Sequence, residues 1–314
     1  MTRTAPDPGL HELRHATSSA GARISYVHEG RGGIPLLLVH GWPETSRIWW
    51  RTIAPLAAAG FEVIVPDLRG FGTDPVAPDG HYDATANARD LHDLVHGELG
   101  HAACFAVGSD FGGVVVQELG QRFPGFVAAQ CLFNTVLPHL RAEYDAAGLR
   151  SGRSPRARAS SDYFLRQGTD ADGLMAELDT PERRRRYVAE MYGHRHWGTP
   201  GGFTPEEVAF VVEPFGDAAR LRASFGLYEV ATGTREPSEP PLPPAVSAVP
   251  TVALHGPDDH VIWQDFPERC EVAFSDLTGP YVIPRAGHFL QWERPELLAR
   301  TISGFLGARF ALPG

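Results

Sequence analysis

The heptapeptide VGSDFGG, residues 107–113, ends a short apolar run and precedes a helix-like pattern that continues to residue 123. A strand that turns sharply into a helix, with small residues two positions before and after one reactive side chain, is a nucleophile elbow. With Ser109 at the tip of this turn, bulky residues would flank it at 107 and 111. With Asp110 at the tip, both flanking positions are glycines. The stretch therefore predicts that Asp110 occupies the tip.

The residue type at the tip predicts the chemistry of the turn. A carboxylate is a competent covalent nucleophile toward carbon, and the ester that it forms can be cleaved by water. Taken alone, the same stretch also fits a glycine-rich turn in which Asp110 only caps the helix. The rest of the sequence must therefore show whether the carboxylate of Asp110 is catalytic or structural.

Short apolar runs on both sides of the turn indicate the fold. Each run is bounded by Gly or Pro, which is typical of strands that are covered on both faces of a sheet. The runs are IPLLLV at 34–39, FEVIVP at 61–66 and ACFAVG at 103–108, and helix-like stretches at 46–58, 84–99 and 111–123 separate them. Because strand and helix alternate, we expect a mostly parallel sheet wrapped by helices.

A segment with a different sequence pattern interrupts this alternation of strands and helices in the second half of the chain. The interrupting segment lacks all-apolar runs, is rich in arginine, and carries helix signals such as the capping box TPEE at 204–207. Strand-like sequence returns at 250–254 and 281–284, and a helix with one apolar face follows. We therefore expect a first part of an α/β core (1–136), a helical insertion (137–249) and a second part of the core (250–314).

Composition excludes several classes of function. The chain has 314 residues, of which 43% are hydrophobic, so it can bury a substantial core. All 28 cationic residues are arginines, which excludes mechanisms that need a lysine, such as Schiff-base chemistry or a P-loop. A formal charge of −10 gives no electrostatic reason to expect nucleic acid or an anionic membrane as a partner. We expect small-molecule substrates and no cofactor.

The cysteines and the distribution of apolar residues indicate whether the protein binds a metal and in which cellular compartment we expect it. The three cysteines, at positions 104, 131 and 270, form no C-x-x-C pair, so we expect buried thiols in a reducing compartment and no metal site. The first twenty residues are polar, and no apolar run approaches about 20 residues. These features predict a cytoplasmic protein without a membrane partner. The sequence leaves open whether it is a monomer or a homodimer.

Four motifs together resemble those of α/β-hydrolases in order and spacing. They are HGWPE at 40–44, DLRGFG at 67–72, the GSDFGG elbow at 108–113 and GHF at 287–289. More narrowly, the chain resembles soluble epoxide hydrolases, in which the elbow carries Asp in place of Ser. The resemblance covers residues 21 to 310 and implies an eight-stranded, mostly parallel sheet with an inserted helical cap, which would be the segment 137–249.

The resemblance also implies a catalytic triad in the order nucleophile, acid, base. His288, before the last helix, takes the place of the base that activates water against the ester on Asp110. The family's Gly-x-x-Asp spacing from Gly256 selects Asp259 as the acid that orients this base, with Asp258 as the alternative.

Two further sets of groups follow from the same resemblance. The backbone N–H groups of Trp42 and Phe111 would form the oxyanion hole. Two tyrosines of the cap would protonate the alkoxide of an opening epoxide, and Tyr228 takes the place of the second. The identity of the first proton donor stays open. Tyr163 resembles the local pattern, and the alternatives are Ser160, Tyr187, Tyr192, His194 and His196.

The expected reaction is hydrolysis of a small apolar epoxide to a vicinal diol through an ester on Asp110. Haloalkane dehalogenases resemble the chain too, but Phe111 offers no N–H side chain to a departing halide. Haloacetate dehalogenases use arginines just beyond the elbow, where this chain has valines at 114–116. A non-catalytic ligand receptor on the same fold remains a third alternative, although binding alone would not require the triad.

Overall fold

The computed structural model describes residues 6–149, 162–193, 195 and 197–310. Its centre is an eight-stranded sheet in the order β1-β2-β4-β3-β5-β6-β7-β8. The pairings of β1 with β2 and of β2 with β4 are antiparallel, and the others are parallel. The strands are β1 (Leu13–Thr17), β2 (Arg23–Glu29), β3 (Ile34–Val39), β4 (Phe61–Pro66), β5 (Cys104–Ser109), β6 (Val127–Thr135), β7 (Thr251–His255) and β8 (Leu277–Val282). The predicted fold class is confirmed.

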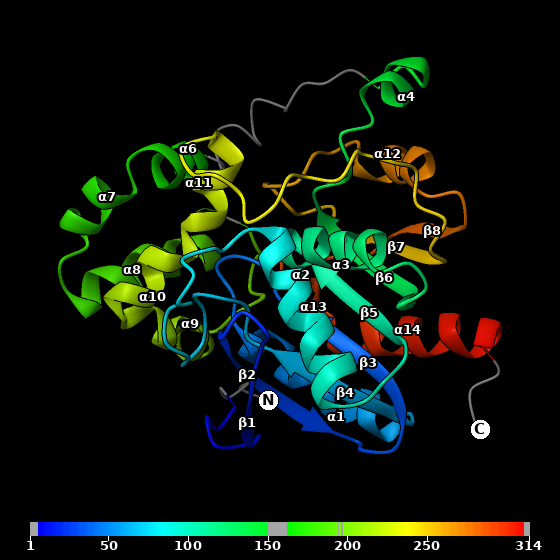
Figure 1. The fold of residues 1–314 in the computed structure, drawn as a ribbon, viewed down its shortest axis with the longest axis horizontal. Coiled ribbons are helices and arrows are strands. Elements are labelled where there is room, and N and C mark those ends of the chain that lie inside the picture. The colour runs from blue at the N-terminus through cyan, green and yellow to red at the C-terminus, as the bar shows by residue number, and fades with distance from the viewer. Residues whose placement is uncertain (1–5, 150–161, 194, 196, 311–314) are drawn as a thin grey trace.

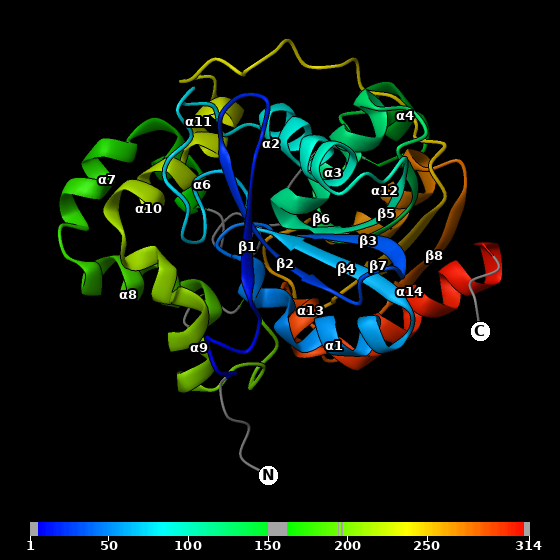
Figure 2. The ribbon, with the colours of Figure 1, turned by 60° about the horizontal axis from the view of Figure 1, so that its bottom comes forward.

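Helices cover both faces of the sheet (Figure 2). On one face lie α2 (Ala84–His92), which a π-helical turn extends over Asp93–Glu98, and α3 (Asp110–Arg122). On the other lie α1 (Trp50–Ala58), preceded by the 3-10 turn Ser46–Trp49, then α13 (Leu290–Glu293) and α14 (Pro295–Phe310). The helix α12 (Phe266–Ala273) packs against β7 and β8. Both faces of the central strands are therefore buried, which explains their all-apolar sequences.

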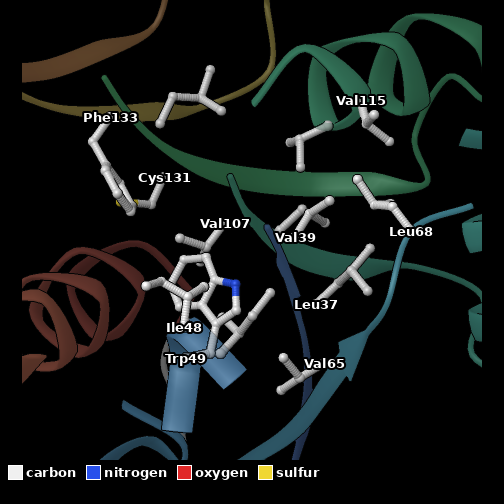
Figure 3. Close-up of a cluster of buried hydrophobic side chains, with 14 of the residues drawn as sticks. Leu37, Val39, Ile48, Trp49, Val65, Leu68, Val107, Val115, Cys131 and Phe133 are labelled. Carbon is white, nitrogen blue, oxygen red and sulfur yellow. The ribbon is translucent and has the colours of Figure 1, made fainter. Parts of the chain in front are cut away.

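The core between the sheet and its helices is apolar and fully buried around β3, β5 and β6 (Figure 3). Trp49 lies beneath the sheet, and its ring meets that of Phe133 edge-on at 6.0 Å. Val39, Val107 and Phe133 are 0 to 1% exposed close to the carboxyl ends of their strands. This packing fixes the strand ends from which the functional loops emerge.

Between β6 and β7 the described residues form helices and no strand. They are α4 (Arg141–Ala146), α6 (Asp162–Thr169), α7 (Ala171–Glu177), α8 (Pro181–Tyr192), α9 (Pro205–Val212), the 3-10 turn Glu213–Gly216, α10 (Ala218–Ser224) and α11 (Gly226–Thr232). Helices α6 to α11 gather at one end of the sheet, whereas α4 lies apart, near α12 (Figure 1). Among the described residues, no helix is long and apolar enough to span a membrane.

Candidate active site

Asp110 is the first residue of α3 and has a left-handed backbone with φ 47°. Non-glycine residues rarely adopt this conformation, and it commonly marks a functional turn. A Cβ atom at Gly112 would lie 2.4 Å from the carbonyl oxygen of His40, and one at Gly108 would lie 2.6 Å from that of Gly112. Both flanking glycines are therefore required by close backbone contacts, and Asp110 stands at the tip of the turn.

The two carboxylate oxygens of Asp110 have different neighbours. Oδ1 accepts a hydrogen bond of 2.8 Å from the backbone N–H of Trp42. Oδ2 lies 3.4 Å from Nε2 of His288. The side chain is largely buried, but it lines a cavity and so can meet a ligand. One oxygen is thus held by a backbone donor, and the other faces a titratable base.

His288 connects Asp110 to a second carboxylate. Its Nδ1 lies 2.9 Å from Oδ2 of Asp259, and both side chains are fully buried. Burial alone would lower the pKa of His288, but the charges and hydrogen bonds of Asp259 and Asp110 raise it well above its usual range. The structure thus brings together the nucleophile, acid and base candidates.

The neighbouring Asp258 points elsewhere. Its Oδ2 accepts a hydrogen bond of 2.8 Å from the hydroxyl of Thr199, in the loop between α8 and α9. Oδ1 of Asp259, in contrast, accepts the backbone N–H groups of Val261 (2.7 Å) and Ile262 (3.2 Å). Both oxygens of Asp259 are therefore fixed, and Asp259 is the member of this pair that lies beside His288.

The HGWPE turn holds its shape through buried polar groups. Nε2 of His40 accepts the backbone N–H of Leu68 at 3.0 Å, and burial lowers the pKa of His40 to about 4, so its imidazole is neutral. Glu44 accepts the N–H of Gly41 and the side-chain amide of Gln291, each at 2.7 Å. Burial raises the pKa of Glu44 to about 7. These groups place the N–H of Trp42 against Asp110.

Tyr163 on α6 and Tyr228 on α11 lie side by side, with ring centroids 5.5 Å apart. The ring of Tyr163 stacks on that of Trp42 at 5.1 Å, and Tyr228 meets Trp42 edge-on at 5.5 Å. Burial raises the pKa of Tyr228 well above its ordinary value, with further contributions from Tyr163 and Asp110. The phenol of Tyr228 is therefore protonated at neutral pH, and the ring of Tyr163 lies beside it.

A cavity of about 890 Å³ joins these residues. Asp110, Tyr163 and Tyr228 line it together with Phe111, whose position after Asp110 puts it at the start of α3. The rest of the wall is mainly apolar and comes from the chain after β6, from α4, α6 and α11, and from the chain before α12: Val136, Leu137, Tyr144, Phe164, Leu227, Val261, Ile262 and Trp263. The cavity is large enough for a drug-sized ligand.

Two of the alternative proton donors, Tyr187 and Tyr192, have other hydrogen-bond partners. Tyr192 donates its hydroxyl proton to the carbonyl oxygen of Pro43 over 2.6 Å. The hydroxyl of Tyr187 accepts a hydrogen bond of 2.9 Å from Gln167. Ser160, His194 and His196 lie outside the described residues. Of these alternatives, the two tyrosines have other contacts within the helical segment and the HGWPE turn.

The sequence did not identify several polar residues that support the site. Glu293 accepts backbone N–H groups from Gly287, next to His288, and from Thr199 (2.8 Å for the latter). The backbone N–H of His288 donates to the carbonyl oxygen of Trp197 over 2.7 Å. The described residues contain no group of three or more His, Cys, Asp or Glu side chains placed to hold a metal ion.

Comparison with known proteins places this chain in a family. A family model described as the alpha/beta hydrolase fold matches residues 34–295. The soluble epoxide hydrolase of Corynebacterium sp. (strain C12) is 28% identical over 299 residues, which cover 93% of this chain and 96% of that protein. Epoxide hydrolase 3 of Xenopus tropicalis is 29% identical over 298 residues, covering 93% of this chain and 76% of that protein.

A solved structure has the same fold. The epoxide hydrolase CorEH, without ligand, superposes with a TM-score of 0.77 at 23% sequence identity, over 95% of this chain and 99% of that chain. The resemblance to epoxide hydrolases is therefore confirmed. With its sheet order, its elbow and a family match over most of its length, this chain belongs to the alpha/beta hydrolase fold family.

Proposed function

We propose that this protein hydrolyses an epoxide to a vicinal diol through a covalent ester on Asp110. The observation that carries the proposal is the presence of two buried phenols, Tyr163 and Tyr228, in the wall of the same cavity as the Asp110 carboxylate. Relatives named epoxide hydrolase, 28 to 29% identical over most of the chain, support the same reaction. In this proposal the segment 137–249 is a cap that supplies the phenols.

In the first step Oδ2 of Asp110 attacks a ring carbon, and the bond between that carbon and the epoxide oxygen breaks. The oxygen leaves as an alkoxide, which is a poor leaving group unless it is protonated. Tyr228 and Tyr163 donate hydrogen bonds to it, and one of them supplies the proton. The bond between Oδ1 and Trp42 keeps the carboxylate in one orientation throughout.

In the second step His288 takes a proton from water, and the water oxygen adds to the ester carbon of Asp110. Negative charge develops on Oδ1, where the backbone N–H of Trp42 already lies, and the N–H of Phe111 is the second donor. Asp259 stabilises the imidazolium. Collapse of the tetrahedral intermediate breaks the ester, His288 protonates the departing diol oxygen, and the Asp110 carboxylate is restored.

The dehalogenase alternatives have less support. The indole N–H of Trp42, which could stabilise a halide, donates to the hydroxyl of Ser224 over 3.2 Å. Phe111 has no side-chain donor, and Val114 lines the cavity where a haloacetate enzyme would carry arginine. The receptor alternative does not account for a buried Asp110–His288–Asp259 set.

A single turnover in ¹⁸O-labelled water tests the covalent mechanism. With enzyme in excess over an aryl epoxide, the first diol should contain no label, because its new oxygen comes from Asp110; the label should appear in Asp110 instead. Label in the first diol would show direct attack by water. A parallel panel of haloalkanes and fluoroacetate checks the alternatives, since halide release without diol formation would reject the proposed substrate.

A further inference from the structure

Asn134 lies at the carboxyl end of β6, beside the strands that lead to the nucleophile and to the acid. It is fully buried, and its backbone is left-handed with φ 44°. Asparagine tolerates this conformation better than most residues, but the conformation still has an energetic cost. A buried polar residue in such a turn therefore needs an explanation beyond chain reversal.

Both ends of the Asn134 side-chain amide are hydrogen-bonded to loops of the candidate triad. Nδ2 donates to the carbonyl oxygen of Gly287 over 2.6 Å and lies 3.3 Å from that of His288. Oδ1 accepts the backbone N–H of Gly256 at 3.0 Å. Gly256 begins the turn that carries Asp259, and Gly287 precedes the base. One side chain therefore bridges the loop of the acid and the loop of the base.

These two loops are packed tightly against each other. A Cβ atom at Gly256 would lie only 2.4 Å from the carbonyl oxygen of Gly287, the same oxygen that Asn134 binds. The next residue along β6, Thr135, donates its hydroxyl to the backbone carbonyl of Asp110 over 2.5 Å. Two adjacent residues at one strand end therefore contact the backbone of all three loops.

We infer that Asn134 is a positioning residue that sets His288 and Asp259 relative to Asp110 for the hydrolysis of the ester. The inference rests on the proposed function, because it concerns the second of the two steps. Formation of the ester needs Asp110 and the two phenols, whereas its cleavage needs a base aligned on water. Small displacements of a base have large effects on rate, so loss of the amide should slow the second step selectively.

The test is the variant Asn134→Gly, because glycine accepts the left-handed backbone and removes only the amide. We expect the rate of ester formation to stay within about threefold of the wild type. We expect ester hydrolysis to slow by roughly tenfold to a hundredfold. Pre-steady-state mixing with an aryl epoxide, followed by intact-protein mass, measures both rates. The amplitude of ester formation counts the folded sites, so partial unfolding does not affect the rates.

A purely structural role predicts a different result, and Gln130→Ala is the matched control. Gln130 is a buried amide on the same strand that donates to the hydroxyl of Thr251 on β7 over 2.9 Å, away from the triad loops. Its loss should lower the melting temperature without changing the ratio of the two rates. If Asn134→Gly also leaves this ratio unchanged, the inference is wrong.

A second variant tests the same inference in case Asn134→Gly folds poorly. Asn134→Asp keeps the shape and the acceptor for Gly256 but loses the donor to Gly287 when its carboxyl group ionises. Its hydrolysis deficit relative to the wild type should therefore grow as pH rises, and a deficit that is absent at every pH would also overturn the inference. If the wild type forms no ester at all, the proposed function fails; if it does, only the role of Asn134 is in question.

Discussion

The hydroxyl of Tyr192, on α8, donates a hydrogen bond of 2.6 Å to the carbonyl oxygen of Pro43. The backbone N–H of the preceding residue, Trp42, donates to Asp110. Tyr192 also stacks on Phe289, next to His288, with ring centroids 4.4 Å apart. A tyrosine of the helical segment thus contacts both the HGWPE turn and the loop that carries His288.

Removing this hydroxyl should loosen the HGWPE turn, which supplies an oxyanion donor in the proposed mechanism. Tyr192→Phe keeps the stacked ring, so we expect a loss of stability of about 1 kcal/mol from the hydrogen bond and a several-fold slower ester hydrolysis. Urea unfolding and single-turnover mass spectrometry measure the two effects. Tyr187→Phe, on the same helix, is the control: it loses a hydrogen bond from Gln167, so it should also lower stability but leave ester hydrolysis unchanged. Equal effects of the two variants on ester hydrolysis would reject a specific role for Tyr192.

The two phenols should act on the first step only. Tyr228→Phe removes a proton donor but keeps the apolar ring, so ester formation should slow by about tenfold to a thousandfold. Tyr163→Phe should have an effect of the same kind, and the double variant should be slower than either. Stopped-flow fluorescence follows the step. Unchanged ester formation in both single variants would remove the phenols from the mechanism.

The pair Asp258 and Asp259 offers a matched comparison. Asp259→Asn should form the ester normally but accumulate it, because a neutral amide cannot stabilise the imidazolium of His288. Asp258→Asn should hydrolyse the ester at nearly the wild-type rate, since Asp258 binds Thr199 instead. Intact-protein mass after one minute of turnover separates them. Accumulation in the Asp258 variant alone would show that the acid was assigned to the wrong neighbour.

The charge of Asp110 should control the titration of His288. Both nearby carboxylates raise the pKa of His288 in the free enzyme, and conversion of Asp110 into an ester removes one of these charges. We therefore expect the pKa of His288 to fall when the ester forms, which makes the imidazole available as a base. Asp110→Asn mimics this change, and nuclear magnetic resonance of the ring should show a lower pKa than in the wild type. An equal or higher value would contradict the argument.

Buried Asp67 predicts a pH dependence of stability. Burial raises its pKa to about 6 from an ordinary value of 3.8, so the native state binds more protons than the unfolded state between these values. The contribution of Asp67 to stability is then most favourable at low pH and is lost as pH rises toward 6. Relative to Asp67→Asn, the wild type should lose on the order of 2 kcal/mol between pH 4 and 7. Urea titrations at both pH values measure this difference, and exposed Asp217→Asn is the control.

The sequence was sufficient to predict features that depend on residues close together along the chain. The elbow was predictable because Gly108 and Gly112 flank Asp110 directly, and the central strands because each is a continuous apolar run. Strands β1 and β2 were not identified, since their sequences mix polar and apolar residues. The last strand was expected at 281–284 but spans Leu277–Val282, because it begins in a polar, Gly-Pro-containing sequence.

Other features depend on contacts between distant parts of the chain. Asn134 binds residues 122 and 153 positions away, and no local pattern marks it as part of the site. The first of the two expected proton donors was ambiguous because several tyrosines and histidines occur in the helical segment. Only the three-dimensional arrangement shows that Tyr163 lies beside Tyr228 and Trp42. Glu44 was visible in its motif, but its partner Gln291 lies 247 residues away.

The backbone bond from His288 to Trp197 limits how substrate and product can travel. An outward swing of the loop between α8 and α9 would break this bond, together with the bonds of Thr199 to Asp258 and Glu293. His288 would then be displaced from its position between Asp110 and Asp259. The cavity also reaches exposed residues, since Val136, His139 and Arg141 line it and are solvent-exposed. Under the proposed function, entry of the epoxide and release of the diol on this side would leave the bonds of His288 and Thr199 intact.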